Sequence, residues 1–227
     1  MTGVIYSASG NFIDTVMRAV FRFEGLSVFR ELRLREGTVT TPIGAVLKAA
    51  SSMAALNSAL VVFAHSALDT GLHDLCVLSA TVSPERWELQ VSESPWSLRD
   101  IAIKGFEDLR RQSIEKRLAK LERDSVLAKT KALLSVYRPA SGRAEFVHRA
   151  PLASLQPAPP SSYVYDEDRL RTFVDARNDL VHAGRVEAQR DALSRLASVD
   201  DEIMFTVHTF LYFSNVVSET EGLAWGV

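Results

Sequence analysis

The sequence predicts an all-α protein, an up-and-down helical bundle with one irregular proline-rich insertion. Apolar residues recur at three- and four-residue spacing along most of the chain, and no alternating strand pattern of any length is present. Five of the eight prolines fall in residues 138–165, which we interpret as a long surface loop rather than a functional lid. The chain of 227 residues is 47% hydrophobic, enough for the core of a single domain over residues 1–227.

In the N-terminal half, the first helix is expected around residues 12–21, where apolar side chains are spaced by three and four. After a break at residues 36–38, Thr41 and Pro42 are typical of a helix start. A long helix rich in Ala and Ser should follow over residues 42–79, because small side chains let neighbouring helices approach closely. A strongly charged helix is expected over residues 105–137.

In the C-terminal part, the pattern predicts a helix over residues 166–181 and two more over residues 186–197 and 200–222. The apolar run within residues 203–213 carries more large side chains than one face of a small bundle requires. We therefore expect it to continue across a two-fold axis in a dimer. The core of the domain is expected to come from residues 42–80 and 165–222.

The charge is unevenly distributed. The formal net charge is −2, so the chain as a whole is not a basic nucleic-acid binder. Residues 99–143, however, hold twelve Lys and Arg against six Asp and Glu. In the basic helix 105–137, Arg110, Arg111 and Arg117 are candidates for contacts with RNA phosphates. The alternative is a solvated face with ion pairs along the helix.

The sequence also bears on the compartment. Cys76 is the only cysteine, so no disulfide can form within the chain, which fits a reducing environment. The N-terminal residues lack the basic-then-apolar order of a signal peptide. The longest apolar stretch, residues 49–64, is interrupted by Ser and Asn and is shorter than the roughly 20 residues of a membrane span. We expect a cytoplasmic protein that does not enter the membrane.

Arg177 is the residue that most needs an explanation. On a helical wheel it lies in the middle of an apolar arc formed by Leu170, Phe173, Val174, Leu180 and Val181. An unpaired buried guanidinium would cost several kcal/mol. Arg177 must therefore pair with an acid from another helix, face a polar cleft, or lie in an interface. Asn178 and His182 lie at one edge of the same arc.

The run FVDARNDLVHAG, residues 173–184, resembles the signature of the HEPN superfamily, in particular its RiboL-PSP-HEPN group. That signature is an Arg, a polar residue, and a His after four intervening residues, which here are Arg177, Asn178 and His182. Residues 66–75, SALDTGLHDL, resemble the earlier HEPN helix that presents an acid toward the motif. The acid in this chain is Asp69, and its place at the border of an apolar arc would let it reach Arg177.

The resemblance implies a metal-independent endoribonuclease that cleaves single-stranded RNA by attack of the 2′-OH, in a toxin or antiviral-defence system. It implies no cofactor, a homodimer, and an antitoxin or defence-system partner protein. An imidazole can transfer protons near neutral pH, and a guanidinium can stabilise charge on the phosphorane. A two-fold axis would bring a second His182 into the cleft. The alternative is a non-catalytic HEPN-like module that binds RNA, nucleotide or a protein.

Other candidate residues favour packing. His65, Asp69 and His73 are spaced by four and could line one helix face as metal ligands, but we expect a packed His65 and an exposed His73 instead. Cys76 lies on an apolar face and is expected to be inert. Trp87 and Trp96 flank another irregular segment and are expected to clamp it onto the bundle rather than to stack on bases.

Overall fold

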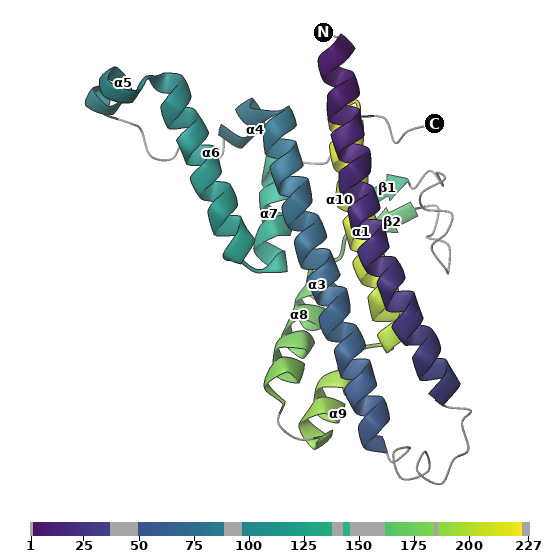
Figure 1. Cartoon of the computed structure of the whole chain (residues 1–227). Coiled ribbons are helices and arrows are strands. Elements are labelled where there is room, and N and C mark those ends of the chain that lie inside the picture. The colour runs from purple at the N-terminus through teal and green to yellow at the C-terminus, as the bar shows by residue number, and fades with distance from the viewer. Residues whose placement is uncertain are drawn as a thin grey trace.

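The computed structural model describes residues 2–36, 50–88, 97–137, 143–145, 162–183 and 186–223. In these residues the chain is a helical bundle accompanied by one pair of three-residue strands (Figure 1). The predicted all-α class and the bundle architecture are confirmed.

Three long helices lie side by side along the length of the bundle: α1 (Thr2–Glu36), α3 (Ala50–Val82) and α10 (Val199–Glu221) (Figure 1). They pack closely because small residues line α3. A Cβ atom added at Gly71 would lie 3.0 Å from the ring of Phe210 on α10 and 3.4 Å from Cβ of Ala19 on α1. The expected first helix, residues 12–21, is the central part of the longer α1.

Helix α10 is buried on nearly every side. Its residues from Glu202 to Ser218 are buried apart from Met204 and His208, and the large side chains, such as Phe210 and Phe213, belong to the core of the chain itself. The expectation that this apolar helix continues across a two-fold axis is therefore wrong. A helix that packs against α1, α3 and α7 within one chain already uses all its apolar faces.

The expected helix over residues 105–137 is divided into α6 (Phe106–Arg123) and α7 (Val126–Tyr137), with the short α5 (Leu98–Lys104) before them. Charged residues continue on both sides of the break, so the sequence pattern does not indicate where α6 ends. Asp124 is extended and caps α6, and the hydroxyl of Ser125 accepts a hydrogen bond from the backbone N–H of Ala128 at the start of α7. Helices α5 and α6 extend from the bundle as an arm, whereas α7 turns back beside α3 (Figure 1).

Trp87 of α4 (Pro84–Glu88) fastens this arm to the bundle. Residues 89–96, which include Trp96, lie outside the described residues, so the expected clamping of that segment stays a prediction. The indole is fully buried, and its Nε1 donates to Oγ of Ser79 at 2.8 Å. The same Ser79 oxygen lies 2.5 Å from the hydroxyl of Tyr137. The guanidinium of Arg117 stacks over the indole at 5.1 Å from the ring centroid. One polar node thus joins α3, α4, α6 and α7.

Two further helices complete the bundle: α8 (Glu167–His182) and α9 (Val186–Ser194), both packed against α3. The predicted bounds of α8 and α10 agree with the structure to within a residue at either end, and α9 ends three residues earlier than expected. The N-cap of α8 is Asp166, whose carboxylate accepts from the backbone N–H of Arg169 at 2.9 Å.

The insertion at residues 138–165 is less irregular than expected. It contains β1 (Arg143–Glu145) and β2 (Ser162–Val164), which pair antiparallel with Arg143 opposite Val164 beside α10. Strands of three residues are too short for an alternating pattern to be recognised. Thr41 and Pro42 lie outside the described residues, as do residues 138–142 and 146–161 of the insertion. No helix within the described ranges has the length and apolar character needed to cross a membrane.

Candidate functional site

Arg177 lies at the edge of the buried face of α8. Leu170, Phe173 and Ala176 are fully buried, which turns the buried face toward Ala176. Val181, expected in the apolar arc, has 49% of its surface exposed. The last turn of α8 therefore emerges from the core, and Arg177 is half-buried rather than enclosed.

The guanidinium of Arg177 is incompletely satisfied. Its Nη1 donates to Oδ1 of Asn178 at 3.1 Å, and the Asn178 side chain is exposed. Its Nε is shielded from solvent, and no acceptor for it is found in the described part of the chain. A buried donor without an acceptor is costly, and because Nε is shielded, a ligand from solvent would meet the terminal nitrogens of the guanidinium instead.

Asp69 does not pair with Arg177, contrary to the expectation. Its Oδ1 lies 2.6 Å from Nζ of Lys129 on α7, which also donates to the backbone oxygen of Asp124 at 3.0 Å. The Lys129 side chain is 0% exposed, whereas the Asp69 side chain is 31% exposed. An unpaired charge is more costly on the fully buried ammonium of Lys129 than on the half-buried guanidinium of Arg177. Asp69 therefore pairs with Lys129.

Lys129 is the residue that the sequence reasoning missed. A signal was present, because Lys129 follows Val126 by three residues and precedes Leu133 by four, at the spacing of one helix face. A lysine inside such an apolar face is the same anomaly that marked Arg177. In the sequence, Lys129 does not stand out from the many exposed charged residues of the same segment.

His65 on α3 lies next to this ion pair. Its ring stacks on Phe173 of α8 at 6.3 Å between centroids, which agrees with the expected packed histidine. Burial, followed by the nearby charge of Arg177, lowers the pKa of His65 to about 4, and the carboxylate of Asp69 opposes this shift only in part. His65 is therefore a neutral imidazole at pH 7. We call His65, Asp69, Lys129 and Arg177 the polar cluster.

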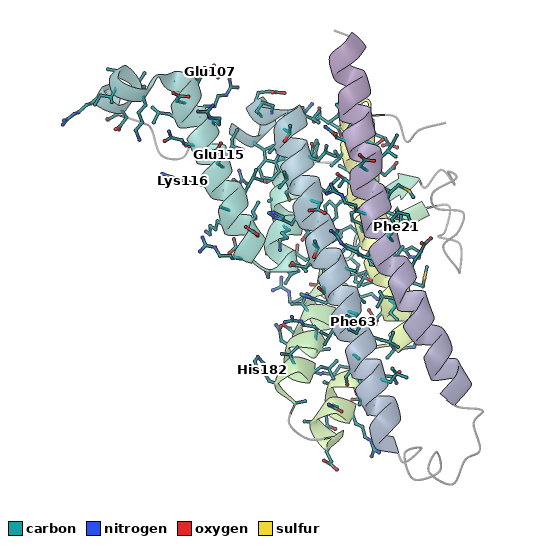
Figure 2. The ribbon with its side chains drawn as sticks, in the orientation of Figure 1. Phe21, Phe63, Glu107, Glu115, Lys116 and His182 are labelled. Carbon is teal, nitrogen blue, oxygen red and sulfur yellow. The ribbon has the colours of Figure 1, made fainter. Side chains whose placement is uncertain are left out.

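His182 stands apart from the polar cluster. It is the last residue of α8, its side chain is exposed, and it points away from α3 (Figure 2). It lies five positions after Arg177 in the sequence, which corresponds to roughly 140° around a helix. Within one chain, the structure brings Arg177 and Asn178 together but does not bring His182 to Asp69.

The three arginines expected to bind RNA have partners within the chain. Arg110 lies 3.3 Å from Glu107, and Arg111 lies 3.0 Å from Asp108 on the same helix. Arg117 is held over Trp87. Across residues 98–124 eight basic residues face six acidic ones, so the positive charge of the arm is largely balanced.

The remaining candidates behave mostly as packing residues. Cys76 is fully buried, and burial raises the pKa of its thiol to about 12. His73 is not exposed as expected, but half-buried in an open groove of about 610 Å³ between α1 and α3. Over the described ranges, no three His, Cys, Asp or Glu side chains are arranged to hold a metal ion.

Comparisons with known proteins leave the fold and the site to be interpreted on their own geometry. No protein-family model matches this chain, and no curated protein or solved structure is found to be similar to it.

Proposed function

We propose that the protein is a metal-independent endoribonuclease of HEPN type, acting on single-stranded RNA in the cytoplasm as a toxin or antiviral-defence effector. The observation that carries the proposal is Arg177, a half-buried guanidinium that hydrogen-bonds Asn178 but forms no ion pair with an acid in the described part of the chain. Because Asp69 is engaged by Lys129, the charge of Arg177 remains available for a phosphate. Asn178 offers an exposed amide beside it.

The proposed chemistry uses groups on α8. The 2′-oxygen of RNA attacks the adjacent phosphorus while its proton passes to a base, and the bond from phosphorus to the 5′-oxygen breaks as that oxygen takes a proton. The products are a 2′,3′-cyclic phosphate and a 5′-hydroxyl. Arg177 stabilises the phosphorane, and His182 transfers protons because an imidazole changes charge near neutral pH.

A homodimer is part of this proposal. Within one chain His182 lies roughly 140° around α8 from Arg177, so a second copy is needed to bring an imidazole to the phosphate. The exposed Val181 and His182 at the end of α8 supply the surface for that contact, since α10 is buried within the chain. An antitoxin or defence-system protein would act by covering the same surface.

A non-catalytic module that binds RNA, nucleotide or a protein partner is the second candidate. One observation favours it, namely the separation of His182 from the polar cluster. A domain that only binds phosphate would need Arg177 and Asn178 but would not need His182.

The test is incubation of the purified protein with total RNA in EDTA, followed by mapping of the cut ends. The His182→Ala variant should stay folded, because the side chain is exposed, and should lose cleavage by at least about 100-fold, the lower range for a proton-transfer group. Asp175→Asn, exposed on the same helix, is the matched control. RNA that stays intact while binding depends on Arg177 would establish the binding module instead.

A further inference from the structure

A second imidazole lies beside Arg177 inside the same chain. His65 on α3 stacks on Phe173, which precedes Arg177 by one helical turn on α8. Both His65 and Arg177 are half-buried, so both side chains retain access to solvent. A ligand that meets the accessible part of the Arg177 side chain therefore also meets the edge of the polar cluster.

The charges around His65 come from three helices. Asp69 on α3 is negative, whereas Lys129 on α7 and Arg177 on α8 are both positive. Since Asp69 and Lys129 form a close pair, the polar cluster keeps one net positive charge at pH 7. That excess charge opposes a proton on His65 and attracts an anion.

We propose that His65 and Arg177 bind one phosphate group of a nucleic acid strand, with a terminal nitrogen of the Arg177 guanidinium donating to a phosphate oxygen and His65 taking up a proton from solvent as the phosphate binds. The inference rests on the proposed function, since it adds His65 to the same phosphate site. It differs in that the binding and the proton uptake occur whether or not the strand is cut. Lys129 is too deeply buried to touch a ligand and acts by holding Asp69.

The coupling follows from electrostatics. A bound phosphate neutralises the charge of Arg177 and places a second negative group near the imidazole, so it favours the protonated form of His65. By linkage, the protonated protein then binds phosphate more tightly than the neutral protein does. Each unit by which a phosphate raises the pKa of His65 corresponds to about tenfold in this affinity ratio.

The experiment uses the full chain and a 2′-O-methyl oligouridylate as probe. This probe carries phosphodiesters but cannot be cleaved by 2′-OH attack, and its charge is constant between pH 4 and pH 8. The imidazole signal of His65 is followed by NMR across that range, with and without the probe. We expect the pKa of His65 to rise from about 4 by at least about one unit when the probe is bound. The probe affinity should accordingly fall at least about fivefold between pH 4 and pH 6.5, since the free imidazole is already half protonated at pH 4.

Two variants test the roles of Arg177 and His65 separately. Arg177→Gln should raise the pKa of His65 in the free protein, because a repelling charge is removed, and the probe should no longer change it. His65→Gln should bind the probe with a smaller pH dependence than the original chain does, because the proposed function leaves the imidazole of His182 near the phosphate. His73→Gln on the same helix is the matched control and should behave like the original chain, with folding checked by circular dichroism at each pH.

The inference fails if the probe does not bind, if the pKa of His65 is unchanged on binding, or if His65→Gln keeps the full pH dependence. These outcomes are separate from the cleavage assay. Loss of RNA cutting with proton-coupled binding intact would reject the ribonuclease and leave the phosphate site in place. Cleavage by the original chain with no response of His65 would retain the ribonuclease and reject the role of His65.

Discussion

The arm of α5 and α6 and the polar cluster contain the same residue types but differ in their exposure to water. On α6 the side chains of Arg111 and Asp108 form an ion pair while 68% and 56% exposed. In the polar cluster Lys129 is wholly buried against Asp69. Exposed pairs contribute between zero and about 1 kcal/mol, whereas breaking a buried pair leaves a charge that water cannot reach.

This difference shows why the number of charges is a poor guide to the site. The segment with the most charge, residues 99–143, first suggested an RNA-binding surface, but along the arm acids largely balance the bases. The polar cluster has few charged groups, yet each of them alters its neighbours because water is excluded. Figure 2 shows Glu107, Glu115 and Lys116 spread along the arm, and His182 on the outer side of α8.

The largest expected effect comes from removing the carboxylate of the buried pair. Asp69→Asn leaves Lys129 charged and buried, so we expect the free energy of unfolding to fall by about 3 to 5 kcal/mol, measured by urea denaturation. Asp108→Asn on α6 is the control and should change it by less than about 0.5 kcal/mol. Equal losses at the two positions would show that burial does not distinguish the two regions.

The complementary change should cost less. Lys129→Met removes the buried charge, replaces it with apolar volume, and leaves a carboxylate that is partly hydrated. We expect the free energy of unfolding to fall by no more than about 1.5 kcal/mol, well below the loss in Asp69→Asn. Denaturation of the two variants side by side measures this asymmetry, and a reversed order would mean that Asp69 is the more strongly desolvated partner.

Acid should weaken the polar cluster before it affects the arm. The pKa of His65 is about 4 in the folded chain and about 6.5 when unfolded, so the unfolded chain binds the extra proton between these values. Stability is then complete above pH 6.5 and falls, by up to about 3 kcal/mol, as the pH drops toward 4. The measurement is the free energy of unfolding against pH, and His65→Gln should show a shallower decline. The contribution of His208, whose pKa is also about 4, should remain in that variant.

A smaller effect is expected where the arm meets the bundle. Arg117 packs over the buried Trp87 and donates to its backbone oxygen at 3.5 Å, so Arg117→Ala should lower the free energy of unfolding by about 1 to 2 kcal/mol. Arg111→Ala on the exposed side of the same helix should change it by less than about 0.5 kcal/mol. Thermal unfolding of both variants would reveal whether Arg117 anchors α6.

The smallest expected effect concerns RNA binding by the arm. Because Arg110 and Arg111 are already paired with acids, reversing both charges to Glu should weaken binding of a single-stranded RNA by less than about threefold at 150 mM salt. Arg177→Gln should weaken it more. Binding measured at several salt concentrations tests this, and a marked loss of salt dependence in the double variant would restore the arm as an RNA surface.

The helical class and the bounds of α8 can be predicted from the sequence, because both depend on local patterns of apolar spacing and capping. Asp166 as N-cap and the apolar face around Phe173 define α8 without reference to any distant residue. The same spacing marked Arg177 as an anomaly. It did not reveal the break at Asp124 and Ser125, since charged residues continue on both sides of it.

The ion-pair partners, in contrast, depend on how the helices pack. Asp69 and Lys129 are 60 residues apart in the chain, and the choice of Lys129 over Arg177 depends on which cation the folded bundle buries more deeply. For the same reason, His65 lies in the polar cluster whereas His182 lies outside it. Local sequence sets which side chains share a face of a helix, but the desolvation that gives a charge its effect arises only when α3, α7 and α8 pack together.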